Sequence, residues 1–261
     1  MRTVTAMLLC VDIGNTNITL GFYEGETLCF TARLSTNPHR TADQYAFEIK
    51  NVVELNGYDH NAIEDAVICS VVPPVGSAVS RAIVKLCDIV PLNIGPGVKT
   101  GLNIKIDNPA QLGADLVAGA VGALESYHTP CIIIDMGTAT TISVLDERGC
   151  FLGGTISAGV GLTLNALVGN TSQLPSVSLE APKTVIGSNT ADCMRSGLIF
   201  GTAAMIDGLI DRIEDELGCK PTIVATGGRS KEIISNCVHD EIIYDENLLL
   251  DGLRAIYAKN S

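Results

Sequence analysis

Two short turns in the sequence combine the residue types that bind phosphate groups. They are Asp12-Ile-Gly-Asn-Thr16 and Asp135-Met-Gly-Thr-Ala139, and each follows an apolar run. The glycine lets the chain turn sharply and brings backbone N–H groups up to an anion. The Asn and Thr side chains add hydrogen-bond donors, and the aspartate can hold Mg²⁺ directly or through water. Together the two turns predict a site for ATP with Mg²⁺.

A third glycine turn strengthens this interpretation. A single Asp-x-Gly turn after a strand is most often purely structural, but here two of them occur about half a chain length apart, at equivalent places in a repeated pattern. Thr226-Gly-Gly228 follows another apolar run and would suit the nucleoside end of ATP. We therefore expect ATP contacts from Gly227 and Gly228 as well.

The elements that must position these turns occur twice in the same order. In the first half the patterns predict a strand over 7–11, a hairpin over 18–23 and 27–34, a helix from Thr41 to Gly57, a strand over 65–72, and helices over 76–88 and 109–127. In the second half they predict a strand over 131–134, a hairpin over 142–146 and 150–157, a long helix over 191–217, a strand over 222–225 and a final helix over 247–258.

The repeat indicates a duplicated α/β domain. We expect one copy over residues 7–128 and the other over 129–258, with a cleft between them that holds the ligands. Met7 resembles a natural start, so Met1 to Ala6 are expected to be an extension without structural meaning.

The composition indicates which classes of partner the protein can bind and in which cellular compartment it is expected. The formal net charge of −12, with 17 scattered Lys and Arg residues, argues against nucleic acid. The nine cysteines are an odd number without a C-x-x-C pair, which favours free thiols in a reducing compartment. The four histidines are isolated from one another, so none is assigned to a metal. No secretory signal and no membrane-spanning apolar stretch is expected, which predicts a soluble cytoplasmic protein without a membrane partner.

Ten short motifs, in this order and spacing, are similar to one known family. They are Asp12-Ile-Gly-Asn-Thr-Asn17, Ser70-Val-Val-Pro-Pro74, Lys99-Thr-Gly-Leu102, Asp107-Asn-Pro109, Gly113-Ala-Asp115, Asp135-Met-Gly-Thr-Ala-Thr-Thr141, Gly153-Gly-Thr-Ile156, Gly187-Ser-Asn-Thr190, Ala225-Thr-Gly-Gly228 and Leu250-Asp-Gly-Leu253. From Met7 onward the chain resembles the type III pantothenate kinases of the actin–Hsp70–sugar-kinase superfamily, the family that includes the Bvg accessory factor. The resemblance implies duplicated ribonuclease H-like (actin-like ATPase) domains with a central interdomain cleft.

The resemblance also implies an activity, its cofactors and its partners. The activity is ATP-dependent phosphorylation of pantothenate to 4'-phosphopantothenate, the first step of coenzyme A biosynthesis. It requires Mg²⁺ with ATP and a monovalent cation, K⁺ or NH₄⁺, and it is carried out by a homodimer.

Residue roles follow from the resemblance at matching positions. Asp115 is the general base, Asp135 holds the monovalent cation, and Asp12 meets Mg²⁺ through ATP. The implied ATP contacts are Asp12, Ile13, Gly14, Asn15, Thr16, Asn17, Ile18, Thr19, Thr138, Gly227 and Gly228. The implied substrate contacts are Ile106, Gly113, Ala114, Asp115, Leu116 and, across a dimer interface, Thr190.

Asp115 also makes chemical sense as a base. A primary alcohol that attacks phosphorus must lose its proton, and a carboxylate within hydrogen-bond reach can accept it. Asp115 lies early in the helix predicted over 109–127, where the helix N-terminus favours the carboxylate form. Outside the family context, an aspartate in a first helical turn more often only stabilises the helix.

Two positions depart from the family pattern at the acid-binding end of the substrate. The usual Gly-x-Asp-Arg motif has Leu116 in place of Arg, and the Tyr that commonly precedes Asp-Asn-Pro is Ile106. A guanidinium–carboxylate pair is worth about 1.5–3 kcal/mol, and an aliphatic side chain cannot replace it. Candidates for a compensating cation are Lys99, Lys105 and Arg195.

Three functions therefore stay open from the sequence. They are a pantothenate kinase, a kinase of another small hydroxylated substrate, and a nucleotide-binding regulator without catalysis. The spacing of Gly197 and Gly201 on the long helix suits close packing against a second subunit, although the two glycines could equally pack inside one subunit.

Overall fold

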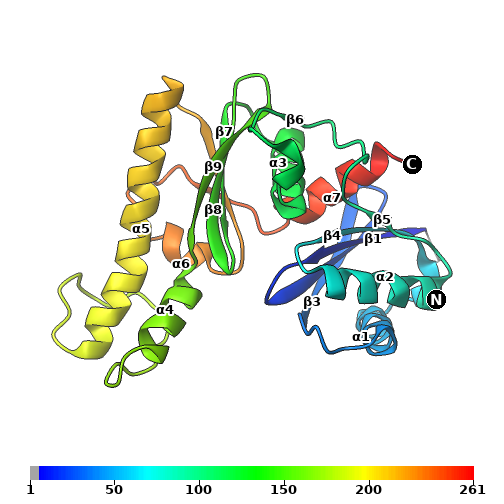
Figure 1. Ribbon diagram of the computed structural model, residues 1–261, viewed down its shortest axis with the longest axis horizontal. Helices are drawn as coiled ribbons and strands as arrows, with labels where there is room; N and C mark the ends of the chain where they lie inside the picture. The colour runs from blue at the N-terminus through cyan, green and yellow to red at the C-terminus, as the bar shows by residue number, and fades with distance from the viewer. Residues whose placement is uncertain (1–5) are drawn as a thin grey trace. The chain divides into compact units, whose positions relative to one another are not determined.

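Two β-sheets organise the chain in the computed structural model, which describes residues 6–261 (Figure 1). Each sheet belongs to its own compact unit. Unit 1 comprises Met1–Leu102, Asn108–Glu125 and Leu248–Ser261, and unit 2 comprises Asn103–Asp107 and Ser126–Asn247. Of the expected N-terminal extension, residues 1–5 lie outside the described part of the chain.

The sheet of unit 1 has five strands in the order β3-β2-β1-β4-β5. β1 pairs antiparallel with β2 and parallel with β4, and β4 pairs parallel with β5. The strands are β1 (Met7–Ile13), β2 (Asn17–Glu24), β3 (Thr27–Ser35), β4 (Ile63–Ser70) and β5 (Leu92–Asn93). The first hairpin, β2 with β3, is confirmed.

Helices cover both faces of this sheet (Figure 1). The helical elements of unit 1 are α1 (Ala42–Leu55), η1 (His60–Ala62), α2 (Pro73–Cys87), η2 (Pro109–Gln111), α3 (Ala114–Ser126) and α7 (Leu248–Ala258). α1 and α2 pack on the face that carries Leu9 and Val11, whereas α3 and α7 pack on the face that carries Cys10. The capping box of Thr41 and Gln44 starts α1 as predicted.

The sheet of unit 2 has six strands in the order β11-β10-β7-β8-β9-β6. The strands are β6 (Asn103–Ile104), β7 (Cys131–Met136), β8 (Ala139–Leu145), β9 (Cys150–Ala158), β10 (Thr222–Thr226) and β11 (Ile243–Tyr244). The helices are α4 (Val160–Gly169), α5 (Thr190–Leu217) and α6 (Ser230–Ile234). α5 and α6 bury one face of the sheet, with Ile199, Ile206 and Ile233 against Ile132 and Ile134.

The two sheets share one topology, which confirms the predicted duplication. With β6 set aside, the order β9-β8-β7-β10-β11 repeats β3-β2-β1-β4-β5. β7 therefore corresponds to β1, and β10 to β4. In the pairing register Asp12 lies opposite Cys69, and Asp135 lies opposite Thr226.

The helix predicted over 109–127 is two elements, so that prediction was wrong at its start. The Asn108 side chain accepts a hydrogen bond from the Ala110 N–H at 3.3 Å and caps the short turn η2. Leu112 then adopts an extended conformation, with φ −67° and ψ 125°, and interrupts the helix. α3 begins only at Ala114, which places Asp115 in its first turn.

The two units do not follow the expected single division at residues 128 and 129. The last helix, α7, belongs to unit 1, and five residues before η2 belong to unit 2. α7 belongs to unit 1 because its Leu250 and Leu253 side chains are buried in the apolar cluster around Cys10 and Val67. β6 joins unit 2 because Asn103 and Ile104 pair with Cys150 and Phe151.

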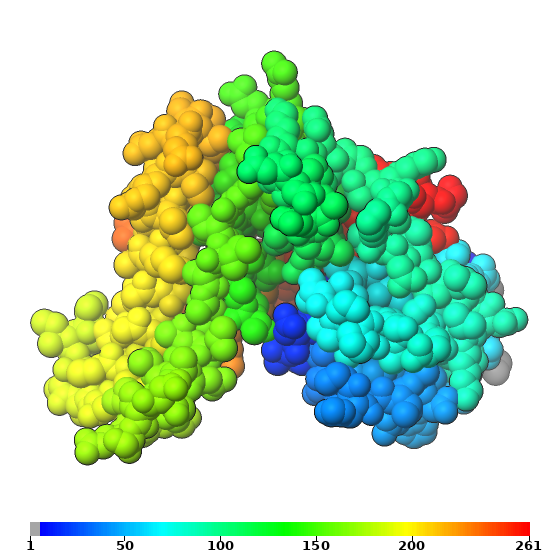
Figure 2. Space-filling model, in the orientation of Figure 1, coloured from blue at the N-terminus to red at the C-terminus, as the bar shows by residue number. Residues whose placement is uncertain are grey.

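We expected no apolar stretch long enough to cross a membrane, and this expectation was wrong for α5. Its 28 residues include an 18-residue window with mean hydropathy 1.3, long and apolar enough to cross a membrane by length and composition. Of this window, 39% is buried inside the structure. The buried side forms the core of unit 2, and the rest of the helix lies at the surface of that unit (yellow to orange in Figure 2). We interpret α5 as a core helix with one uncovered side.

Candidate active site

The first turn follows β1 directly and is held by backbone hydrogen bonds. The Gly14 N–H donates to the Asn17 carbonyl at 3.0 Å, which closes the turn. Asn15, Thr16 and Asn17 are exposed. Ile13 and Ile18 are fully buried and can offer only backbone groups. The turn therefore has the exposed amides and hydroxyl that phosphate binding needs.

A buried cysteine links the two carboxylates predicted for unit 1. Cys69 lies opposite Asp12 in the β1–β4 pair and is fully buried. Burial raises the pKa of the Cys69 thiol well above its ordinary value, and the negative charges of Asp12 and Asp115 and a hydrogen bond to Asp12 raise it further. Asp12 and Asp115, far apart in the sequence, are thus both close enough to act on one thiol.

Asp115 is half-buried in the first turn of α3. Its Oδ1 accepts a hydrogen bond from the Leu116 N–H at 2.9 Å. Gly113 leaves room for this carboxylate, because a Cβ atom at Gly113 would lie 2.3 Å from Asp115 Oδ1. The glycine of the Gly-Ala-Asp motif therefore sets where the carboxylate can lie. Ala114 and Leu116 on either side are half-buried as well.

In unit 2 the second and third turns lie against each other. β7 and β10 are parallel, with Thr226 opposite Asp135, so the two turns leave the same edge of the sheet. Gly227 has a φ of +98°, and a Cβ atom there would lie 2.7 Å from Asp135 Oδ1 and 2.7 Å from the Met136 carbonyl. Only glycine fits this position. Thr138 and Gly228 beside it are exposed.

The remaining predicted substrate residues of unit 2 are Ile106 and Thr190. Ile106 is half-buried, with its Cγ2 3.8 Å from where a Gly153 Cβ would lie. Thr190 is exposed at the first position of α5, after Asn189, whose side chain accepts from the Asp192 N–H at 2.9 Å. The predicted site residues thus form two groups. Unit 1 carries residues 12–19 and 113–116, and unit 2 carries Ile106, Asp135, Thr138, Thr190, Gly227 and Gly228.

Comparison with known proteins decides the family. The sequence model described as type III pantothenate kinase matches residues 8–212 of this chain.

The chain belongs to the type III pantothenate kinase family.

Relatives agree with that membership, and a solved structure is similar in fold. A type III pantothenate kinase of Brevibacillus brevis is 40% identical over 256 residues, which cover 97% of this chain and 99% of the relative. One from Bifidobacterium animalis subsp. lactis is 42% identical over 254 residues, covering 97% and 100%. A Baf family protein of Campylobacter jejuni, described as a transcriptional activator, has a TM-score of 0.62 at 21% identity, covering 97% of this chain and 98% of that one.

A further solved structure bears on the fold alone. It is the activator of a 2-hydroxyisocaproyl-CoA dehydratase from Clostridium difficile with bound ADPNP, with a TM-score of 0.59, 17% identity, and coverage of 97% of this chain and 94% of that one. The predicted class of duplicated ribonuclease H-like, actin-like domains is confirmed by these likenesses and by the repeated sheet order.

Two of the three cations considered as replacements for the family arginine already have acidic partners. The Lys105 ammonium lies 2.8 Å from Asp146 Oδ2, and this hydrogen bond is the main cause that lowers the pKa of Asp146 to about 2. The Arg195 guanidinium pairs with Asp192 at 3.3 Å. The Lys99 residue is exposed, and its backbone N–H donates to the Asn260 side chain. In this type III pantothenate kinase sequence, Lys99 is thus the candidate that the described ion pairs leave uncommitted.

Sequence reasoning missed two residues that contact the first turn. Cys69 is hydrogen-bonded to Asp12. The Thr36 hydroxyl donates to the Gly14 carbonyl at 2.7 Å. No motif marks either residue, because each reaches the turn through the pairing of strands. The sequence predicted the strand over 65–72 that carries Cys69, but it gave no signal that this strand pairs with the one that ends at Asp12.

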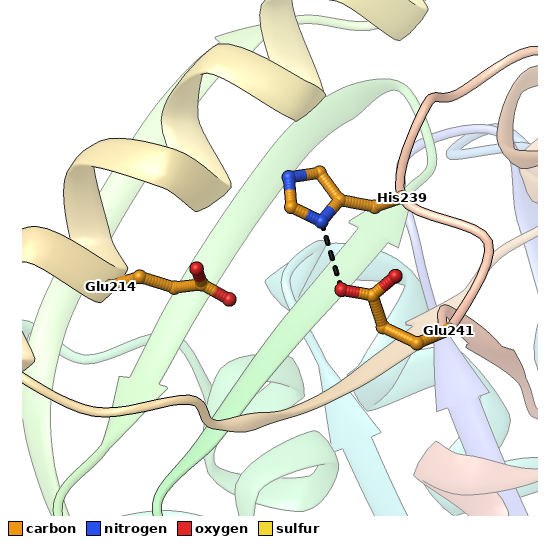
Figure 3. Close-up of side chains that lie close together, drawn as sticks. All are labelled: Glu214, His239 and Glu241. Carbon is orange, nitrogen blue, oxygen red and sulfur yellow. Dashed lines mark hydrogen bonds and ion pairs between the residues drawn. The ribbon is translucent and has the colours of Figure 1, made fainter.

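A cluster of charged side chains lies at the far end of α5 (Figure 3). Ligand atoms of Glu214, His239 and Glu241 lie within 4.8 Å of one another. His239 Nδ1 is 2.9 Å from Glu241 Oε1, and His239 Nε2 is 3.0 Å from Asp211 Oδ1. The Lys220 ammonium pairs with Glu214. Both imidazole nitrogens are therefore engaged, and we interpret the cluster as an ion-pair network.

This network predicts a pH-dependent contribution to stability. Burial lowers the pKa of His239, but the hydrogen bonds to Glu241 and Asp211 outweigh it, so the pKa lies above its ordinary value of 6.5. The folded state thus favours protonated His239. Its stabilisation is complete below the unfolded pKa of about 6.5 and is lost as the pH rises through the higher folded value. We expect His239→Gln to lower the melting temperature more at about pH 5.5 than at about pH 9.

The matched control is His39→Gln, because His39 is exposed and only its backbone N–H makes a described hydrogen bond. The melting temperature of His39→Gln should equal that of the unmodified protein at both pH values. An equal loss for His239→Gln at both pH values would contradict a charged role for the imidazole.

Proposed function

We propose that this protein transfers the γ-phosphoryl group of ATP to the hydroxyl of pantothenate, forming 4'-phosphopantothenate and ADP in the first step of coenzyme A biosynthesis. Membership of the type III pantothenate kinase family supports the reaction. The observation that carries the assignment of residues is that Asp12 and Asp115 belong to the same unit, where buried Cys69 lies opposite Asp12 and both carboxylates raise the pKa of its thiol. The phosphate-binding turn and the proposed carboxylate base therefore lie in the same compact unit.

The residues of unit 1 supply the general base and hold the phosphates. Asp115 accepts the proton of the substrate hydroxyl as the hydroxyl oxygen bonds to the γ-phosphorus. The bond from the γ-phosphorus to the bridging oxygen breaks, and ADP leaves. The exposed amides and side chains of the first turn orient the phosphates. Mg²⁺ bound with ATP neutralises phosphate charge, and the Asp12 carboxylate at the base of the turn is the oxygen ligand type that Mg²⁺ takes.

The oxygen atoms around Gly227 fit a monovalent cation. Asp135 Oδ1 and the Met136 carbonyl both approach the space beside Gly227, each 2.7 Å from where a Cβ would lie. A carboxylate and a carbonyl are the hard oxygen donors that an alkali cation prefers, and both can also accept hydrogen bonds from NH₄⁺. We assign K⁺ or NH₄⁺ to Asp135, and nucleotide contacts to Thr138, Gly227 and Gly228.

A coupled assay of ADP release tests the proposed reaction. We expect turnover only when pantothenate, Mg²⁺ and K⁺ or NH₄⁺ are all present, and loss of turnover when any one of them is omitted. Replacing K⁺ by Na⁺ in the complete mixture separates a cation requirement from an ionic-strength effect. No pantothenate-dependent ADP release in the complete mixture would refute the proposed function.

A second candidate is a kinase for another small alcohol, and Leu116 and Ile106 favour it. Both side chains are half-buried and aliphatic, and neither can pair with a carboxylate. Comparing pantothenate with pantothenyl alcohol, which has no carboxylate, separates the two candidates. If the alcohol gives the higher kcat/KM, the acceptor lacks an acid group. If ATP binds and no acceptor is phosphorylated, the protein is a nucleotide-binding regulator.

We also propose a cytoplasmic homodimer that uses unit 2 as its interface and acts without membrane or nucleic acid. Apolar side chains stay exposed on this unit, among them Ile156 at 77% and Leu162 at 49%. On α5, Cβ atoms at Gly197 and Gly201 would have no atom within 4 Å, so these glycines do not pack inside the subunit. Thr190, at the start of the same helix, would then face the partner. The charge of −12 supports the absence of nucleic acid.

Light scattering after size exclusion measures the proposed dimer. Gly201→Leu should yield a folded monomer, because the added side chain has free space within the subunit but would clash with a closely packed partner. Gly95→Leu is the control, since Gly95 in unit 1 also has no atom within 4 Å of its Cβ position. A monomeric unmodified protein would refute the dimer, and a dimeric Gly201→Leu variant would place the interface elsewhere.

A further inference from the structure

Thr36 makes two hydrogen bonds to the first turn from outside it. The Thr36 hydroxyl donates to the Gly14 carbonyl at 2.7 Å. The Thr36 backbone N–H donates to the Thr16 carbonyl at 3.0 Å. Thr36 is the residue directly after β3, and it lies where the pairing of Asn17 with Ser35 ends. Thr36 therefore holds the backbone of the turn at two carbonyls, those of Gly14 and Thr16.

These two bonds fix the direction in which the amides of the turn point. In a trans peptide group the C=O and the following N–H point in opposite directions. The Gly14 carbonyl shares a peptide group with the Asn15 N–H, and the Thr16 carbonyl shares one with the Asn17 N–H. Because Thr36 holds both carbonyls on its own side, the Asn15 and Asn17 N–H groups are directed away from Thr36. Preorganised donors of this kind are what an anion site needs.

The backbone bond alone does not orient the whole turn. It would persist with any residue except proline at position 36, because it uses the Thr36 N–H. The Gly14–Asn15 peptide is held by the hydroxyl, and Gly14 is the residue with the fewest steric limits on its backbone. A side chain without a hydroxyl would leave that peptide free to rotate. The specific requirement is therefore for a hydroxyl at this position.

We propose that Thr36 is a positioning residue for nucleotide binding, whose hydroxyl holds the Gly14–Asn15 peptide with its N–H toward the ATP phosphates. This inference rests on the proposed function for the identity of the ligand, but its effect is on nucleotide affinity and does not depend on the acceptor. It predicts a change in the Kd and KM for Mg·ATP, with a much smaller change in kcat.

Two substitutions at Thr36 and one control on β3 test the proposal. Thr36→Val has nearly the same shape and lacks the hydroxyl, so it should weaken Mg·ATP binding about five- to tenfold, the factor expected for one lost hydrogen bond. Thr36→Ser keeps the hydroxyl and should stay within about twofold of the unmodified protein. Thr31→Val on β3 is the control, because Thr31 is exposed.

Affinity is measured by calorimetric titration with Mg·ATP in the absence of pantothenate, and kcat and KM are measured in the coupled assay where turnover occurs. Unchanged affinity in Thr36→Val, or equally weak binding in Thr36→Ser, overturns the positioning role. If Thr36→Val does not fold, Thr36→Ala takes its place with the same expected loss. A full-length protein that binds Mg·ATP but does not phosphorylate pantothenate would refute the proposed function and leave the Thr36 test intact.

Discussion

Replacing Asp115 with Asn is expected to lower kcat about 10²- to 10⁴-fold, the range that a positioned general base contributes. Asparagine keeps the size of the side chain but cannot accept the proton that the attacking hydroxyl must lose. Binding of Mg·ATP should stay nearly unchanged, because Asp115 is not among the proposed nucleotide contacts. Steady-state kinetics with pantothenate and calorimetric titration with Mg·ATP measure the two quantities separately.

Glu125→Gln provides the matched control for this substitution. Glu125 is a carboxylate near the other end of the same helix, and it pairs with Lys259 at 2.7 Å. An exposed pair of this kind contributes little to stability, so its loss should leave both kcat and nucleotide affinity close to normal. If Asp115→Asn turned over at the normal rate, Asp115 would not be the base.

The second large effect is expected on stability, from Gly252→Ala. Within unit 1, α7 crosses α3 at two glycines, and a Cβ atom at Gly252 would lie 1.9 Å from the Ala118 carbonyl. A Cβ at Gly122 would likewise lie 2.1 Å from the Leu248 carbonyl. These neighbours are backbone atoms in helices, which cannot move out of the way as a side chain can. We expect a loss of about 3 kcal/mol of unfolding free energy, seen as a fall of about 6–12 °C in melting temperature.

Gly161→Ala is the control for the crossing. Gly161 also lies in a helix, α4, but a Cβ there would have no atom within 4 Å. Its helix propensity should improve by up to about 1 kcal/mol, so its melting temperature should hold or rise. A Gly252→Ala variant as stable as Gly161→Ala would mean that the two helices of unit 1 can separate at no cost.

Local chemistry in the sequence was sufficient to predict most of the elements near the site. The β1 and β7 runs, their hairpins and the capping box at Thr41 depend on residues close together in the chain, and the structure has them where the pattern placed them. The start of α3 was missed because Pro109 suits the first turn of a helix, and the competing cap by Asn108 made a separate short turn. The short strands β5, β6 and β11 have two residues each and carry no periodicity.

The sequence did not show which distant segments pack against each other. The membership of α7 in unit 1 depends on packing across most of the chain, and nothing in Leu248–Ala258 itself specifies which sheet buries its apolar stripe. The same limit applies to the site. Asp12 and Asp115 were chosen from motifs, but their common neighbour Cys69 follows only from the β1–β4 register. The contact of Thr36 with the first turn could not be predicted either, because it also depends on how the strands pair.

The placement of α7 also constrains the order in which the protein can be made. Unit 2 is encoded between the main part of unit 1 and the helix that completes it, so unit 2 is a nested insertion. During synthesis the N-terminal segments emerge first and begin to fold. The apolar face around Cys10 and Val67 nevertheless stays uncovered until Leu250 and Leu253 have left the ribosome. The unit that carries Asp115 should therefore acquire its final rigidity last, after the inserted unit has had time to fold.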